Sequence, residues 1–155
     1  MMQTEIELYS EQFDFVTSDA RFTAFIGGIG SGKTLGGCVK AIGHCQPSAL
    51  GLIVAPTYGM LRDATWRTFQ SVAGGAIAEF LRGEMRVVMV NGSEILFRSA
   101  DDPERLRGPN LSWAFIDEAA LCHKMAWPIT IGRLRKDGKA GPCWLTTTPK
   151  GRNWV

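Results

Sequence analysis

Eight consecutive residues, Gly-Gly-Ile-Gly-Ser-Gly-Lys-Thr at positions 27–34, constrain this 155-residue chain more than any other feature. They match the pattern G-x-x-x-x-G-K-[ST] and lie between an apolar, β-rich run at residues 22–26 and a helical pattern at residues 33–45. Glycines let a backbone wrap around phosphate with several N–H groups pointing inward, and the following helix adds its positive N-terminal end. The sequence therefore predicts a phosphate-binding loop between a buried strand and a helix.

The residue types in this loop suit a nucleotide and a metal ion. Lys33 is expected to neutralise the β- and γ-phosphates of ATP, and Thr34 to place its hydroxyl on Mg²⁺. The remaining predicted nucleotide-binding positions of the loop are Gly28, Gly30, Ser31 and Gly32. The alternative is a glycine-rich turn with no ligand.

Apolar segments alternate with helical patterns along the rest of the chain. Strands are expected at residues 52–55, 113–116 and 143–147, helices at residues 58–73 and 123–136, and a short helix or turn at residues 12–18. Asn91-Gly92 separates residues 85–90 from residues 93–98 and predicts a β-hairpin, as an antiparallel insertion or edge. This order indicates an α/β fold of the P-loop NTPase type, with a mainly parallel sheet flanked by helices.

The strand at residues 113–116 ends in two acidic residues, Asp117 and Glu118. Asp117 is expected to hold the Mg²⁺ shell opposite the loop lysine. Glu118 is expected to polarise the attacking water as a general base. A strand followed by an acidic helix start is the alternative interpretation.

Two further segments carry candidate residues. Threonines Thr146, Thr147 and Thr148 end the strand at residues 143–147, where their hydroxyls could reach a γ-phosphate or its water. Arg105 and Arg107 lie in a turn at residues 99–108, where an exposed arginine could act on a neighbouring subunit's nucleotide. The alternatives are a β-rich strand ending in a Pro-Gly turn and an ordinary surface loop.

Composition and charge exclude several classes of protein. No apolar run approaches the roughly 18 residues of a membrane span, and residues 1–10 lack the basic residues of a secretory signal. Cysteines 38, 45, 122 and 143 form no C-x-x-C pair, so reduced core thiols are expected, and the His44-Cys45 and Cys122-His123 pairs have the wrong spacing for a usual zinc site. Net charge is only +2, but residues 131–155 hold six basic residues against one acid, a distribution that could meet phosphate.

In their order along the chain, five segments resemble the ATPase domain of the large terminase subunit of tailed bacteriophages. They are GGIGSGKT, VAPTY at residues 54–58, SADDPERLRG at residues 99–108, WAFIDEA at residues 113–119 and TTTPKG at residues 146–151. The resemblance covers residues 12–155. It implies a RecA-like, additional-strand (ASCE) ATPase that works in the host cytoplasm, without a membrane. There it forms a homo-oligomeric ring at the portal vertex and pumps double-stranded DNA into the procapsid, with the portal protein and the small terminase subunit as partners.

The resemblance also assigns roles to individual residues. Lys33, Thr34, Asp117 and Glu118 match the family's nucleotide, metal and base positions, and Thr146, Thr147 and Thr148 match its coupling motif. Arg107 lies where some members carry an arginine acting on the next subunit, with Arg105 as second choice. Gln12 lies where the family often has a glutamine that pairs with adenine through its donor and acceptor, and a polar helix-start residue is the alternative.

Two departures from the family pattern matter. Ile29 stands inside the phosphate loop where many members have an arginine, and isoleucine cannot stabilise the charge of the γ-phosphate. Either an arginine from another subunit stabilises that charge, or this chain hydrolyses ATP slowly. The chain also stops after the coupling motif, which predicts a P-loop ATPase domain at residues 1–155 that is incomplete at its C-terminus, without a nuclease domain. That incompleteness could expose apolar surface, for which the candidates are Met125, Trp127, Trp144 and Trp154, although buried core is the expected place of each.

Other functions remain open at this point. One is a nucleotide-binding fragment with little or no hydrolysis, one is a helicase-like ATPase of another family, and one is an adaptor that docks on the portal or small terminase subunit. The candidate DNA contacts are Lys136, Lys139, Lys150 and Arg152, whose phosphate contacts would weaken steeply with salt.

Overall fold

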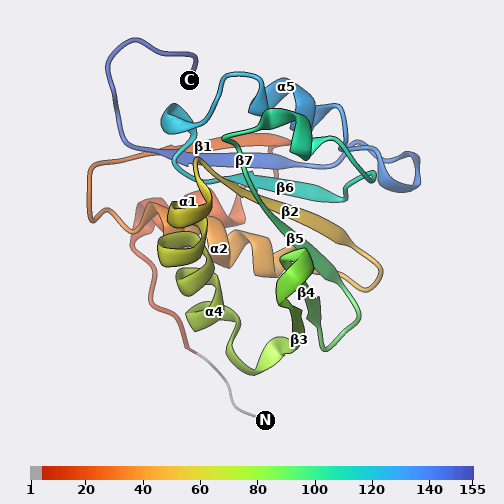
Figure 1. Cartoon of the computed structure of the whole chain (residues 1–155). Helices are drawn as coiled ribbons and strands as arrows, with labels where there is room; N and C mark the ends of the chain where they lie inside the picture. Colours follow the sequence, from red (N-terminus) through yellow and green to blue (C-terminus); the bar gives the residue numbers. More distant parts are fainter. Residues whose placement is uncertain (1–4) are drawn as a thin grey trace.

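The computed structural model describes residues 5–155, which form a seven-stranded sheet with helices on both faces (Figure 1). The strands are β1 Phe22–Ile26, β2 Leu50–Ala55, β3 Ile77–Leu81, β4 Arg86–Met89, β5 Glu94–Ser99, β6 Trp113–Ile116 and β7 Cys143–Thr147. The α-helices are α1 Ser10–Thr17, α2 Lys33–Gly43, α3 Tyr58–Met60, α4 Arg67–Ala73 and α5 Ala126–Ile131. A π-helical turn, η1 Leu61–Trp66, joins α3 to α4, and short 3₁₀ turns are η2 Gly74–Ala76, η3 Arg82–Glu84, η4 Pro103–Leu106, η5 Ala119–Leu121 and η6 Lys136–Gly138.

The strand order is β1-β7-β6-β2-β5-β4-β3. Neighbouring strands from β1 to β5 are parallel, whereas β4 pairs antiparallel with both β5 and β3. The mainly parallel α/β sheet predicted from the sequence is therefore confirmed. The predicted hairpin is β4–β5, but β5 also pairs in parallel with β2, so the antiparallel edge consists of β4 and the unpredicted strand β3.

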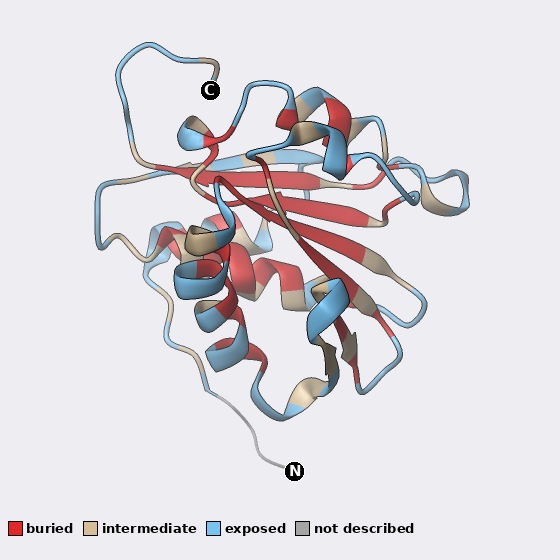
Figure 2. Cartoon of the chain, viewed as in Figure 1, coloured by how far each residue is buried: buried red, intermediate tan, exposed pale blue. Residues whose placement is uncertain are grey.

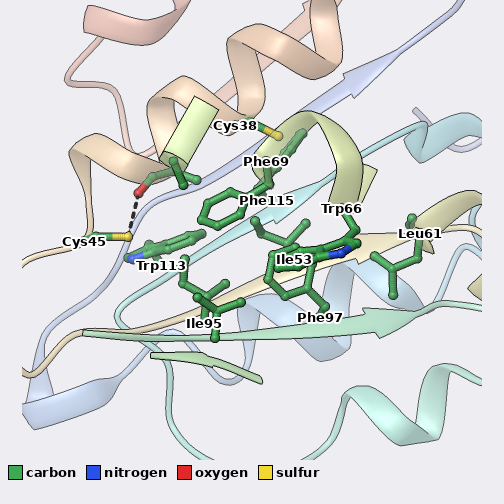
Figure 3. Close-up of a cluster of buried hydrophobic side chains, with 14 of the residues drawn as sticks. Cys38, Cys45, Ile53, Leu61, Trp66, Phe69, Ile95, Phe97, Trp113 and Phe115 are labelled. Carbon is green, nitrogen blue, oxygen red and sulfur yellow. Dashed lines mark hydrogen bonds between the residues drawn. The ribbon is translucent and has the colours of Figure 1, made fainter. Parts of the chain in front are cut away.

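Each face of the sheet carries its own hydrophobic core. Strand β6 is buried throughout: Trp113 and Phe115 pack on the side of α1, α2 and α4, and Ala114 and Ile116 on the side of α5 (Figure 2). The first core is rich in aromatic rings, which Figure 3 shows gathered between the sheet and the helices. Helix α2 comes so close to the sheet that a side chain at Gly37 would collide with the Phe115 ring.

The helix predictions hold in the first half of the chain and fail at residues 123–136. Residues 58–73 form one continuous helical stretch, although its middle widens into the π turn. The helix predicted at residues 123–136 is only Ala126–Ile131. Pro128 is tolerated in its first turn, and Gly132 lies at its end.

Strand β1 forms one edge of the sheet and is half open to solvent, with Phe22 43% and Ile26 58% exposed. Of the four candidates for an exposed apolar surface, Met125 is exposed, and Trp127 and Trp154 are partly buried. Trp144 is fully buried, because it stacks on Trp113 and Phe115 beneath α2, and it therefore lies in the core rather than on an exposed surface.

The burial of the four cysteines agrees with the core positions expected for them. All four are buried and free, and residues 5–155 contain no cluster of His, Cys, Asp and Glu suited to a metal ion. Burial raises the pKa of the Cys45 thiol to about 11 and that of Cys122 to about 12, so both remain protonated at neutral pH. In the same part of the chain, no helix is both long and apolar enough to cross a membrane.

Candidate nucleotide site

The predicted site residues meet where three parallel strands end. The loop at residues 27–34 follows β1, Asp117 and Glu118 follow β6, and Thr146 and Thr147 are the last residues of β7. Because β7 lies between β1 and β6, the carboxyl ends of all three strands share one edge of the sheet. Open α/β sheets bind ligands at this edge.

The loop has the backbone of a phosphate cradle. Gly30 and Gly32 have φ angles of +77° and +72°, a region that favours glycine. Helix α2 begins at Lys33 directly after the loop and so directs its N-terminal dipole toward it. Ile29 is 93% exposed at the tip and contributes no charge to the cradle.

Lys33 forms an ion pair with Glu118 across the site. The distance from Lys33 Nζ to Glu118 Oε1 is 3.1 Å, and the two side chains are 8% and 21% exposed. Glu118 has a left-handed backbone, with φ of 49°, which is uncommon for a residue other than glycine. The predicted phosphate-binding cation and the predicted general base are thus in direct contact, so a phosphate group entering the loop competes with Glu118 for Lys33.

Asp117 is buried and surrounded by hydroxyl groups. Its Oδ1 accepts a hydrogen bond from Thr146 at 2.7 Å and its Oδ2 one from Thr65 at 2.7 Å, while Thr34 Oγ1 lies 3.0 and 3.2 Å from the two oxygens. Burial raises the pKa of Asp117, the three hydroxyl donors lower it, and the charge of Glu118 raises it further.

These oxygens suit a hard divalent cation. Thr34 and Asp117 supply one hydroxyl and one carboxylate side by side, which is the donor set that Mg²⁺ takes when it also binds phosphates. Among residues 5–155, Asp117 makes no ion pair with a Lys or Arg side chain, so its buried charge has no cation from the protein. The residues present therefore fit the metal role predicted for them.

Gln12 contacts the phosphate-binding loop directly. Its Nε2 donates to the Gly32 carbonyl at 2.9 Å, and its Oε1 accepts from the Tyr9 N–H at 2.9 Å. The side chain is 2% exposed. Gln12 thus links the start of α1 to the loop, and pairing with adenine stays a prediction.

A buried lysine holds α1 in this position. Lys40 Nζ, on α2, donates to the carbonyls of Phe15 and Ser18 at 2.9 Å and of Val16 at 3.3 Å. These carbonyls lie at the C-terminal end of α1, where a cation is favoured. Lys40 is 2% exposed, and burial lowers its pKa.

The three threonines predicted as a coupling motif have different surroundings. Thr146 bonds Asp117 directly, whereas Thr147 Oγ1 accepts from the Ala120 N–H at 3.0 Å behind Glu118. Thr148 is half-buried at the end of the strand. Two of the three therefore touch the segment that carries the predicted metal ligand and base.

The two candidate arginines stay outside this cluster. Arg107 pairs with Glu104 at 2.6 Å and Arg105 with Asp102 at 3.5 Å, within and directly beside the η4 turn. In the described part of the chain, none of their hydrogen bonds or ion pairs reaches the loop.

The predicted DNA contacts are also separated from one another. Lys136 and Lys139 precede β7, and Lys136 Nζ donates to the Ser48 carbonyl at 2.7 Å, near the start of β2. Lys150 and Arg152 follow β7 and therefore lie beyond the carboxyl end of that strand, whereas Lys136 and Lys139 lie before its amino end.

Thr65 is the site residue that sequence reasoning missed. The sequence places it on the buried side of the helix at residues 58–73, together with Leu61, Phe69 and Val72. A hydroxyl on an otherwise apolar face was the available signal. Only the fold shows that this face meets Asp117.

Comparison with known proteins gives one family. The family described as "Terminase large subunit, T4likevirus-type, N-terminal" matches residues 24–155. The PBSX phage terminase large subunit of Bacillus subtilis (strain 168) is 27% identical over 163 residues, covering 100% of this chain and 37% of that protein. The large subunit of Thermus virus P23-45 is 29% identical over 148 residues, covering 80% of this chain and 30% of that protein. The chain thus spans well under half the length of these relatives.

Solved structures agree. The ATPase domain of the Thermus phage P74-26 large terminase superposes with a TM-score of 0.77 at 27% identity, covering 96% of this chain and 67% of that one. The large terminase of another thermophilic bacteriophage, in complex with ADP, shares the fold with a TM-score of 0.72 at 15% identity, covering 90% of this chain and 39% of that one. The RecA-like architecture expected from the resemblance is therefore confirmed. The chain belongs to the terminase large subunit family, T4likevirus type, of which it carries the N-terminal part.

Proposed function

We propose that this chain is the ATP-hydrolysing part of a phage terminase large subunit, and that hydrolysis drives double-stranded DNA into the procapsid. The observation that carries the proposal is the convergence of Lys33, Thr34, Asp117 and Glu118 at one sheet edge, beside a loop shaped for phosphate. The relatives are large terminase subunits, and one similar structure is named an ATPase domain.

The residues divide the work as follows. Backbone N–H groups of residues 28–34 and the N-terminus of α2 bind the phosphates, and Lys33 leaves Glu118 for the β- and γ-phosphates. Glu118, released from Lys33, accepts a proton from the water that attacks the γ-phosphorus. Thr34 and Asp117 would hold Mg²⁺, which neutralises charge that develops on the phosphate oxygens.

A neighbouring subunit would complete this site. Ile29 supplies no charge to the loop, and within residues 5–155 no arginine forms a hydrogen bond or ion pair with the loop. Arg107 is exposed on a turn, so on assembly it would leave its partner Glu104 and reach the nucleotide of the next protomer in a homo-oligomeric ring, with Arg105 as second candidate. The portal protein and the small terminase subunit would be partners of this ring in the host cytoplasm.

The test is the Mg²⁺-ATP hydrolysis rate per subunit across a range of protein concentrations. We expect the rate to rise with concentration, to vanish in Glu118→Gln and to fall by about 10³-fold or more in Arg107→Ala. The Arg105→Ala variant separates the two candidates from the same turn, because it should keep the rate if Arg107 is the arginine that acts on the neighbouring nucleotide. A low background rate that neither concentration nor Glu118→Gln changes would reject hydrolysis by this chain.

The second candidate is a nucleotide-binding piece with little or no hydrolysis of its own. The fully exposed Ile29 favours it, because this side chain cannot stabilise γ-phosphate charge. It requires nucleotide binding that Lys33→Ala weakens, together with a rate at background at every protein concentration. The family match leaves a helicase-like ATPase of another family without support.

A further inference from the structure

The π-helical turn η1 brings one hydroxyl group into the proposed metal site. Thr65 is 1% exposed, and its Oγ1 donates to Asp117 Oδ2 at 2.7 Å from 52 residues earlier in the chain. A π turn adds a residue to the helical repeat, and such turns often occur at functional sites. Here the turn directs a hydroxyl group at a carboxylate from a helix face that is otherwise apolar.

The donors around Asp117 divide between its two oxygens. Oδ1 receives Thr146 at 2.7 Å and the Glu118 N–H at 3.1 Å, in addition to Thr34. Oδ2 receives only Thr65 and, at the longer distance of 3.2 Å, Thr34, among the residues described. Because the proposed function gives the Thr34 oxygen to Mg²⁺, Thr65 is the donor that remains on Oδ2 when the metal is bound.

The position of Thr65 is itself held from two sides. Its carbonyl oxygen lies 3.9 Å from the Cys38 thiol on α2, and its neighbours Leu61 and Trp66 are buried in the aromatic core. Side-chain rotation of Thr65 is restricted by β-branching and by this packing. Among the rotamers that remain, the 2.7 Å hydrogen bond to Asp117 Oδ2 selects the one that directs the hydroxyl toward the carboxylate.

We propose that Thr65 is a positioning residue for the metal-binding carboxylate: its hydroxyl fixes the rotation of Asp117, so that carboxylate and Thr34 face the same cation. This inference rests on the proposed function. Hydrogen-bond partners behind metal ligands set ligand orientation, and their loss typically lowers metal affinity by about 10- to 100-fold.

The test compares Thr65→Val, which keeps shape and removes the hydroxyl, with Thr65→Ser, which keeps the hydroxyl. Thr130→Val is the matched control, because Thr130 is fully buried and its Oγ1 has no hydrogen-bond partner in the described part of the chain. Binding of a fluorescent ADP analogue is measured in EDTA and during a Mg²⁺ titration. Thermal unfolding of each variant is followed in parallel.

We expect Thr65→Val to need about 10- to 100-fold more Mg²⁺ for half-maximal enhancement of nucleotide binding, with its affinity in EDTA unchanged. Thr65→Ser and Thr130→Val should titrate like the unaltered chain. If Thr65→Val does not fold, Thr65→Ala carries the same expectation.

Three results overturn the inference. In the first, the Mg²⁺ titration of Thr65→Val matches that of the unaltered chain. In the second, the affinity in EDTA falls as far as the affinity in Mg²⁺ and Thr65→Ser does not restore it, which marks a purely structural role. In the third, the unaltered chain shows no Mg²⁺ enhancement at all, which rejects the proposed function first and the inference with it.

Discussion

Replacing Glu118 by glutamine should strengthen nucleotide binding while it stops hydrolysis. In the structure Glu118 Oε1 forms an ion pair with Lys33 Nζ at 3.1 Å, and Lys33 is the cation proposed to bind the phosphates. Glutamine keeps the size and one oxygen acceptor of the side chain but removes its charge. Lys33 then leaves its partner at a lower cost, and the negative phosphates no longer meet a carboxylate.

The size of this effect follows from the geometry. Two unit charges 3.1 Å apart attract by about 5 kcal/mol at an effective dielectric constant of about 20, before desolvation is subtracted. Hydrogen bonds between charged groups contribute only about 1.5–3 kcal/mol net, and the glutamine oxygen retains part of that. A change of about 1–2 kcal/mol remains, which corresponds to about 5- to 30-fold tighter binding.

The assay is equilibrium titration with a non-hydrolysable ATP analogue in Mg²⁺. Glu94→Gln is the matched control, because Glu94 also forms an ion pair, with Arg86 at 3.0 Å. Glu94 is the first residue of β5, at the amino end of the strand and not at the carboxyl end where the nucleotide site lies. The affinity of Glu94→Gln should equal that of the unaltered chain. An affinity of Glu118→Gln that is unchanged within twofold, or weaker, would refute competition between Glu118 and phosphate for Lys33.

Three further predictions concern stability. Gly37→Ala should lower the free energy of unfolding by about 1–3 kcal/mol, because the added methyl collides with a buried ring, whereas Gly43→Ala, with open space around it in the same helix, should be neutral or stabilising; thermal melting of both variants decides. Lys40→Met should cost about 1–3 kcal/mol in urea unfolding, because it strips three carbonyls at the end of α1 of their donor, and equal stability would contradict this. Burial and the nearby charge of Lys40 lower the pKa of His44, so below about pH 6.5 the unfolded chain binds a proton more readily than the folded chain does. The Tm should therefore fall as the pH is lowered, and it should fall less steeply in His44→Gln. Parallel curves of Tm against pH for the two proteins would reject this.

Three strands have the bounds predicted from the sequence, and each is a mainly apolar or β-rich run with a clear end. Residues 22–26, 113–116 and 143–147 are strands with the predicted bounds, because each apolar run ends at a glycine, an acid or a proline-containing turn. Strand β3 escaped prediction because Ile77–Leu81 contains Glu79 and is stabilised as a strand only by pairing with β4 at the sheet edge.

The candidate site likewise contains residues that could be predicted from the sequence and residues that could not. Lys33, Thr34, Asp117 and Glu118 could be assigned because motif spacing and strand order together determine where such residues meet. Thr65 and the partner of Gln12 could not, because each depends on how a helix packs against the sheet or the loop, and local sequence does not encode that packing.

The most direct test of the central claim is a crystal structure of this chain with Mg²⁺ and a non-hydrolysable ATP analogue. We expect the phosphates within the loop at residues 28–34, Lys33 Nζ moved from Glu118 to a phosphate oxygen, and a metal ion between Thr34 Oγ1 and the Asp117 carboxylate. An analogue bound elsewhere, or a Lys33–Glu118 ion pair that persists at 3.1 Å beside bound phosphates, would contradict the account.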